Sequence, residues 1–333
     1  MLKIALESLG CSKNLVDAEI MMGILNEKGY KLTGNFEEAD VILVNTCGFI
    51  ESAKQESIQT ILEFAELKET ANLKLLIVTG CLAQRYADEL KEEIPEIDAI
   101  VGTGSYQNID EILAELSEKH QIVSLNNIEF AYDENLPRYV STPSHMAYLK
   151  IGEGCDNKCT YCIIPYARGG KVRSRDLESI VSEVEKLVLN GYKEVVLTGI
   201  HVASYGKDVR DENINLLTVI KAINEINGIE RIRLSSVEPV LFTDEFVNEV
   251  SKMEKVMPHY HLSLQSGCDE TLKRMNRRYT TAEYKAIVDK LREAIPNVAI
   301  TTDVIVGFPG ETEEDFQETL ELVKEVGYSS AFT

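Results

Sequence analysis

Short apolar runs alternate with helical patterns along nearly the whole of this 333-residue chain. In the first 125 residues, three apolar runs have the character of buried parallel strands: 3–10, 41–47 and 74–81. Each is followed by a helical pattern: 12–29, 51–69 and 83–93. Because strands that alternate with helices form a parallel sheet covered on both faces, this region predicts a doubly wound α/β domain.

The second half of the chain repeats this alternation. The stretch 126–145 is polar, contains two prolines and has no period, which is typical of a linker. Six strand candidates follow: 147–154, 194–199, 231–237, 259–265, 298–307 and 328–333. Helical patterns separate them: 177–190, 214–226, 243–253, 281–294 and 313–326. Six β/α units predict a parallel barrel or part of one, and the chain stops inside the sixth strand.

The composition predicts a cytoplasmic protein. No apolar run reaches the roughly 18 residues that span a bilayer, so no membrane association is expected. The N-terminus lacks the basic start and long apolar core of a signal peptide. In a reducing compartment, clustered cysteines bind metal or do chemistry more often than they form disulfides. The net charge of −21 argues against a broad nucleic-acid-binding face but leaves room for a local basic groove.

Three of the seven cysteines lie within eight residues, at Cys155, Cys159 and Cys162. They directly follow the first strand of the second half, at the end of a barrel where active sites are found. Three thiolates are one short of a structural zinc site and one short of a filled cubane iron–sulfur cluster. A 4Fe–4S cluster on three ligands keeps one iron open to chelate a substrate or cofactor. The alternative is a zinc site with a distant fourth ligand.

Three further cysteines each end a predicted strand of the first half: Cys11, Cys47 and Cys81. The carboxyl ends of strands in a doubly wound sheet lie along one crevice, so these side chains can converge. We predict a second three-thiolate cluster there. The alternative is three small buried thiols, which are common for free cysteine. Cys268 stands alone and is expected to be a plain thiol.

These features together resemble one known family. The pattern C-x-x-x-C-x-x-C, with Tyr161 before its third cysteine, joined to an N-terminal domain with three dispersed cysteines, is similar to the radical S-adenosylmethionine (SAM) methylthiotransferases. The resemblance implies a flavodoxin-like cluster domain at 1–125, a linker at 126–145 and a radical-SAM core, a partial (β/α)6 barrel, at 146–333. In the family a small β-barrel TRAM domain follows this core, and we expect no part of residues 1–333 to form it.

The resemblance also implies an activity. The cluster on Cys155, Cys159 and Cys162 would bind SAM, and one electron, from a donor such as flavodoxin or ferredoxin, would release a 5′-deoxyadenosyl radical. That radical would abstract hydrogen from a C–H bond too weakly acidic for a side-chain base. A second 4Fe–4S cluster, on Cys11, Cys47 and Cys81, would carry the sulfur that another SAM methylates.

Residues at other strand ends resemble the SAM pocket of the family: Tyr161, Thr198, Gly199, Glu238, Gln265, Ile305 and Gly307. The alternative for the glycines is a simple role in strand-to-helix turns. Arg168 could meet the cofactor carboxylate or the substrate.

The substrate indications point in two directions. Up to about residue 190 the chain resembles the branch that modifies an aspartate of ribosomal protein uS12. The segments 197–208 and 262–280 instead resemble branches that modify an adenosine beside the tRNA anticodon. The basic run Lys273 to Arg278 could meet RNA phosphates or be a solvated helix face. The longer resemblance and the acidic charge favour the ribosomal protein. Two alternatives to a methylthiotransferase belong to other functional classes. They are an inactive iron–sulfur fragment and a non-redox zinc-binding module.

Overall fold

The structure, a computed structural model, describes residues 2–119, 121–129, 136–211 and 213–333. The chain divides into two compact units. We call the first, Met1–Ser141 with Glu153–Cys155 and Ile163–Arg173, the N-terminal unit. The second, the C-terminal unit, comprises the remaining segments, Thr142–Gly152, Asp156–Cys162 and Ser174–Thr333. Residues 130–135 of the predicted linker lie outside the described residues, and its described parts form no helix or strand.

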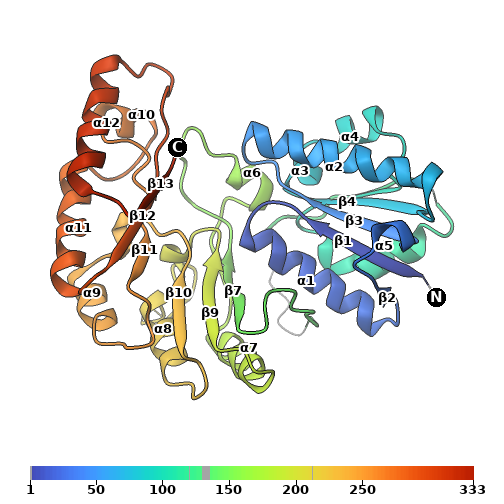
Figure 1. The fold of residues 1–333 in the computed structure, drawn as a ribbon, viewed down its shortest axis with the longest axis horizontal. Helices are drawn as coiled ribbons and strands as arrows, with labels where there is room; N and C mark the ends of the chain where they lie inside the picture. Colours follow the sequence, from blue (N-terminus) through green and yellow to red (C-terminus); the bar gives the residue numbers. More distant parts are fainter. Residues whose placement is uncertain (1, 120, 130–135, 212) are drawn as a thin grey trace. The chain divides into compact units, whose positions relative to one another are not determined.

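The N-terminal unit is built on a six-stranded sheet in the order β2-β1-β3-β4-β5-β6. All five pairings are parallel, and the strands are β1 (Lys3–Ser8), β2 (Lys31–Leu32), β3 (Val41–Thr46), β4 (Leu75–Gly80), β5 (Ala99–Val101) and β6 (Ile122–Ser124). Helices α2 (Glu51–Thr70), α3 (Cys81–Arg85) and α4 (Ala87–Glu93) cover one face, and α1 (Ser12–Glu27) and α5 (Ile109–Glu115) cover the other (Figure 1). The predicted doubly wound architecture is confirmed.

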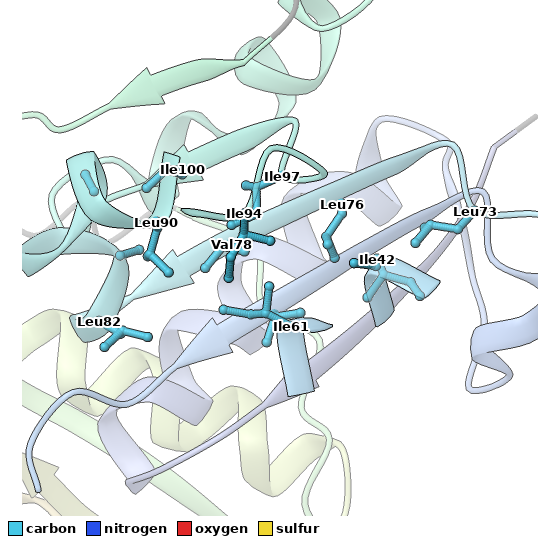
Figure 2. Packing of buried hydrophobic residues seen from close by; sticks show 14 of the residues in the cluster. Ile42, Ile61, Leu73, Leu76, Val78, Leu82, Leu90, Ile94, Ile97 and Ile100 are labelled. Carbon is cyan, nitrogen blue, oxygen red and sulfur yellow. The ribbon is translucent and has the colours of Figure 1, made fainter. Parts of the chain in front are cut away.

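The core under α2 shows why these apolar runs form strands. Figure 2 shows Ile61 of α2 over the side chains of Ile42 on β3 and of Leu76 and Val78 on β4. All four side chains are fully buried. Burying an aliphatic side chain of this size contributes about 1.5–3 kcal/mol, so the continuous apolar pattern of β3 and β4 is explained by cover on both faces.

Two details of the N-terminal unit differ from the sequence prediction. The helix expected at 83–93 is broken at Tyr86, whose φ of −126° and ψ of 37° are not helical, and its first part begins at Cys81 itself. Strands β2, β5 and β6 were not predicted, because runs of two or three residues are too short to show a period.

The C-terminal unit holds two sheets, in which the pairings of β7 with β9, β9 with β10, β11 with β12 and β12 with β13 are parallel. One sheet has the order β10-β9-β7-β8 and a second the order β11-β12-β13. An isolated parallel bridge between Val237 and Leu262 connects the segments that follow β10 and β11. The strands are β7 (Met146–Glu153), β8 (Arg173–Ser174), β9 (Glu194–Gly199), β10 (Arg231–Leu234), β11 (His259–His261), β12 (Ala299–Asp303) and β13 (Ser330–Phe332).

Helices connect these strands in the way that the sequence predicts for a partial (β/α)6 barrel. They are α7 (Leu177–Leu189), α8 (Leu216–Asn224), α9 (Asp244–Val250), α10 (Asp269–Arg274), α11 (Thr281–Ala294) and α12 (Glu313–Val326). Thr280 and Thr312 begin α11 and α12 with capping boxes, which satisfy the free N–H groups of the first turn. α11 and α12 run side by side along β12 (Figure 1). Among the described residues, no helix is long and apolar enough to cross a membrane.

Candidate metal centres and cofactor site

The three cysteines of the N-terminal unit follow three neighbouring strands of its sheet. Cys47 comes directly after β3, Cys81 directly after β4, and Cys11 lies between β1 and α1. Because β1, β3 and β4 are adjacent and parallel, their carboxyl ends share one edge of the sheet. The structure therefore brings Cys11, Cys47 and Cys81 to the same edge, where ligands of doubly wound sheets bind.

The backbone at this edge is shaped for a close approach between cysteines. Gly10 has a φ of +94°, and a Cβ placed on it would lie 2.8 Å from Cys47 Cβ and 3.1 Å from Cys47 Sγ. Only glycine tolerates this conformation and this contact. Burial, together with the nearby Cys11 and Cys47, raises the pKa of the Cys81 thiol to about 11, although Arg168 lowers it. The three sulfur atoms are thus close enough to influence one another's ionisation.

The donor set at this edge is one that iron–sulfur clusters use, because their ligands are cysteine thiolates. Among the described residues, no group of three or more Cys, His, Asp or Glu side chains is arranged to hold one metal ion. No disulfide forms among the seven cysteines, all of which the structure describes, so the three thiols of this edge are free to act as ligands.

A buried arginine lies against this group of cysteines. Arg168 ends the short helix α6 (Ile164–Arg168), and its Nε donates a hydrogen bond to Cys81 Sγ at 3.3 Å. Its Nη1 forms ion pairs with Asp17 and, at 3.4 Å, with Glu153, and its Nη2 donates to the side-chain oxygen of Asn14. Burial opposes the charge of this guanidinium, but Asp17, Cys81 and Glu153 raise its pKa above the ordinary value.

A contact of Arg168 with the cofactor carboxylate or the substrate stays a prediction, and in this structure its partners are protein groups. Its side chain is only 2 % exposed, and each of its three nitrogens has a partner inside the N-terminal unit. A buried charge needs such partners, because desolvation without them would cost several kcal/mol.

Further hydrogen bonds hold the segment around Arg168 in the N-terminal unit. Thr103 Oγ1 donates to the carbonyl oxygen of Ala167 at 2.6 Å, and α6 contacts α3 (Figure 1). The N–H of Cys155 donates to the carbonyl oxygen of Gly169 at 3.1 Å. The backbone that carries Cys155 is thus fixed by local contacts.

In the C-terminal unit, a second buried arginine contacts another cysteine of the predicted radical-SAM motif. Arg277 Nη1 donates to Cys159 Sγ at 3.4 Å and to Glu238 Oε1 at 2.8 Å. The N–H of Cys162 donates to the carbonyl oxygen of Cys159 at 3.0 Å, which closes a tight turn. Asn276 Nδ2 donates to the carbonyl oxygen of Lys158 at 2.7 Å. The segment that follows α10 therefore supports the loop that carries Cys159.

Glu238 and Tyr161, both predicted cofactor contacts, lie in this neighbourhood. Burial alone would raise the pKa of Glu238, but the adjoining His201 and the Arg277 guanidinium lower it to about 2. Glu238 is therefore a carboxylate at neutral pH. Burial raises the pKa of Tyr161, and its ring packs edge-on against Phe308 at a centroid distance of 6.4 Å. A carboxylate and an aromatic face thus stand beside Cys159.

The other predicted cofactor contacts lie at strand ends of the same unit. Thr198 and Gly199 are buried and complete β9. Gln265 has a positive φ of +70°, and its carbonyl oxygen accepts a hydrogen bond from the N–H of Ile305 at 2.8 Å. Gly307 has a φ of +71°, and a Cβ on it would meet nothing within 4 Å, so it shapes a turn without a close contact. The structure thus joins Gln265 to Ile305, while the roles of all these residues toward SAM stay predictions.

Three residues of these sites were not predicted individually from the sequence. Arg277 was counted only within the basic run Lys273 to Arg278, of which Lys273 and Arg278 are exposed. Asn14 and Asp17, the partners of Arg168, were not predicted either. The sequence did contain a sign of their role, because both are polar residues on the first turns of a helix that is otherwise largely apolar. The structure shows that both are buried.

Comparisons with known proteins define the class. Residues 149–323 match the Radical SAM superfamily, and residues 3–102 match the Uncharacterized protein family UPF0004. In fold, the chain is similar to the radical S-adenosylmethionine methyltransferase TsrM from Kitasatospora setae, with a TM-score of 0.70 at 13 % identity over 99 % of this chain and 71 % of that one. The class is thus a radical-SAM enzyme, which uses an iron–sulfur cluster and SAM.

Curated relatives define the family more narrowly. The chain is 59 % identical, over 98 % of its length and 73 % of the relative's, to "Ribosomal protein uS12 methylthiotransferase RimO" of Clostridioides difficile. It is 47 % identical, over 98 % of its length and 72 % of the relative's, to the protein of the same name in Geotalea uraniireducens. The chain belongs to the RimO family of radical-SAM methylthiotransferases.

Proposed function

We propose that this protein attaches a methylthio group to an aspartate of ribosomal protein uS12, using SAM and two 4Fe–4S clusters. The observation that carries the proposal is the 59 % identity, over nearly the whole chain, to a relative named for that reaction. When bound, the clusters and SAM supply a one-electron source, a carbon radical and sulfur for a C–H bond that no side-chain base could deprotonate.

Cys155, Cys159 and Cys162 are the proposed ligands of the cluster that binds SAM. The protein also supplies the charged side chains that surround these ligands. Arg277 Nη1 donates a hydrogen bond to Cys159 Sγ, which orients the side chain of this proposed ligand. Glu238, held as a carboxylate by Arg277 and His201, offers an acceptor for the amino group of the cofactor.

Cys11, Cys47 and Cys81 are the proposed ligands of the second cluster. Gly10 lets Cys47 approach the end of β1, and Arg168 donates to Cys81 Sγ. Because Asp17 and Asn14 hold the other nitrogens of Arg168, the guanidinium keeps one orientation toward Cys81. These residues would hold the proposed cluster at the edge of the sheet.

The charge of the chain supports a basic protein substrate over RNA. A net charge of −21 repels a polyanion and attracts a basic protein. The similarity to relatives named for uS12 spans the segments 197–208 and 262–280 as well, so these segments do not set the chain apart from that family. We place the reaction in the cytoplasm, with a flavodoxin or ferredoxin as the electron donor.

A competition experiment tests the substrate. The protein is reconstituted anaerobically with iron and sulfide, then supplied with reductant, SAM, unmodified uS12 and hypomodified tRNA together. We expect methylthio adducts on the uS12 aspartate, detected by mass spectrometry, and none on the tRNA. Adducts on the tRNA alone would overturn the proposed substrate, and a Cys159→Ala variant serves as the inactive control.

A further inference from the structure

Three cations of the C-terminal unit stand on its surface without an anionic partner. They are Lys158, which lies in the cysteine loop after β7, Lys273 in the last turn of α10, and Arg278, which follows that helix. All three side chains are exposed, and in the described part of the chain none of them pairs with a carboxylate. Their neighbour Arg274, by contrast, pairs with Asp315 at 2.7 Å. We call Lys158, Lys273 and Arg278 the basic patch.

Hydrogen bonds join the loop of Lys158 to the segment that carries the other two cations. Asn276 Nδ2 donates to the carbonyl oxygen of Lys158 at 2.7 Å, and the N–H of Thr160 donates to the carbonyl oxygen of Met275 at 3.2 Å. The three cations therefore belong to one surface. Because Cys159 lies between the two bonded residues of the loop, the same contacts fix the basic patch beside a proposed ligand of the SAM-binding cluster.

The basic patch is positive in an otherwise acidic chain. Lys273 and Arg278 line an open cavity of about 380 Å³, as do three carboxylates. Two of these, Asp269 and Glu283, accept hydrogen bonds from N–H groups at the start of α11, where the helix dipole offsets their charge. Glu270 is the third carboxylate. Among the described residues of this surface, three unpaired cations therefore outnumber the one carboxylate that no helix terminus offsets, although the chain carries a net charge of −21.

The chemistry required at this place selects the kind of partner. The proposed SAM-binding cluster needs one electron from outside the chain, and electron tunnelling slows steeply with distance, so a donor must dock close to the cysteine loop. Electron-transfer complexes have small interfaces, and charge complementarity speeds the encounter of their partners. Long exposed cations suit a protein with carboxylates around its redox centre. They suit an RNA backbone less, because the acidic chain as a whole repels a polyanion.

We propose that the basic patch is the docking surface for an acidic electron-transfer protein that reduces the SAM-binding cluster. The inference rests on the proposed role of Cys155, Cys159 and Cys162 as ligands of that cluster. One electron leaves the donor, which is oxidised, and enters the cluster, which is reduced, and no atom moves between the two proteins. The basic run Lys273 to Arg278 then has a function that needs no RNA substrate.

The test removes three charges in the basic patch or three elsewhere in the same unit. The full chain, anaerobically reconstituted, is compared as wild type, as a patch variant and as a control variant. The patch variant carries Lys158→Gln, Lys273→Gln and Arg278→Gln. The control variant carries Lys186→Gln, Arg231→Gln and Lys324→Gln, at exposed positions where α7 and α12 end and β10 begins. The control cations also pair with no carboxylate among the described residues.

Binding and electron transfer are measured separately. The dissociation constant and association rate of flavodoxin, the probe, are measured at low and at physiological ionic strength. Formation of 5′-deoxyadenosine from SAM is followed with reduced flavodoxin and, in parallel, with dithionite. Affinity for tRNA and iron content are measured for each protein.

We expect the patch variant to bind flavodoxin about tenfold more weakly than the wild type at low ionic strength, through slower association, because three exposed charge pairs are lost. The difference should shrink as salt screens the charges. The flavodoxin-driven rate should fall by a similar factor, whereas the dithionite-driven rate, which needs no docking, and the control variant should match the wild type. If the patch variant loses iron, Lys273→Gln with Arg278→Gln, which leaves the cysteine loop unchanged, should show about a threefold loss.

Unchanged flavodoxin binding in the patch variant would overturn the inference, as would no binding to the wild type. An equal loss in the control variant would overturn it too, because net charge alone would then explain the effect. A patch variant that loses affinity for tRNA and keeps its affinity for flavodoxin would assign the surface to RNA instead. The proposed function fails in a different way: a wild-type protein that binds flavodoxin through the basic patch but modifies neither uS12 nor tRNA.

Discussion

Two arginines of this chain make the same contact in different surroundings. Arg168, in the N-terminal unit, donates to Cys81 Sγ at 3.3 Å, and Arg277, in the C-terminal unit, donates to Cys159 Sγ at 3.4 Å. Both side chains are at least nine-tenths buried. Every nitrogen of Arg168 has a protein partner, whereas Nη2 of Arg277 has none in the described part of the chain. We therefore call the hydrogen-bond network of Arg168 closed and that of Arg277 open.

The difference follows from the number of anions that the protein supplies. Two carboxylates, from Asp17 and Glu153, surround Arg168, so its charge is compensated before any ligand binds. Arg277 has one carboxylate, Glu238, which His201 also adjoins. The protein therefore supplies more compensating charge to Arg168 than to Arg277.

The largest expected effect is a difference in the free energy of unfolding between variants of the two arginines. Arg168→Met leaves two carboxylates buried without their cation, and breaking a buried ion pair costs about 3–5 kcal/mol. Arg277→Met removes an arginine whose hydrogen bonds are incomplete, and we expect a loss of about 1–3 kcal/mol. Urea unfolding of the two metal-free variants measures the difference. Equal losses would contradict the distinction between a closed and an open network.

A smaller effect concerns the cysteine group of the N-terminal unit. In Gly10→Ala the new Cβ would lie 2.8 Å from Cys47 Cβ, so Cys47 must move. We expect iron content after reconstitution to fall by up to half, because one of the two proposed 4Fe–4S clusters would be lost. Gly29→Ala is the matched control, since Gly29 has a similar φ of +86° and nothing within 4 Å. Iron loss in both variants would point to backbone strain alone.

The smallest effect concerns the support of α6. Thr103→Val removes the buried hydrogen bond to the carbonyl oxygen of Ala167, next to Arg168, and should cost about 1 kcal/mol. A small drop in the midpoint of urea unfolding, with iron content unchanged, is the expected result. A loss as large as that of Arg168→Met would mean that α6 depends on this bond more than on the ion pairs of Arg168.

The arrangement of strands and helices could be predicted because each long element carries its own period. The predicted limits of β9 (194–199), α11 (281–294) and α12 (313–326) agree with the structure to the residue. The break at Tyr86 could not be predicted, since residues 83–93 are helical in pattern throughout.

The cysteines could be predicted as a group because strand ends meet at one sheet edge. The arginines could not, because the sequence does not show which member of a basic run is buried. Arg277 and Arg278 are neighbours of the same type, and only the fold places the first beside Cys159 and the second in solvent.

The most direct test of the central claim, that one cysteine group cleaves SAM and the other provides the sulfur, separates the two reactions. A variant with Cys11, Cys47 and Cys81 all replaced by alanine is reconstituted and given reductant, SAM and uS12. We predict that 5′-deoxyadenosine still forms and that no methylthio-uS12 appears. Methylthio-uS12 from this variant, or loss of 5′-deoxyadenosine while half of the iron is retained, would contradict the account.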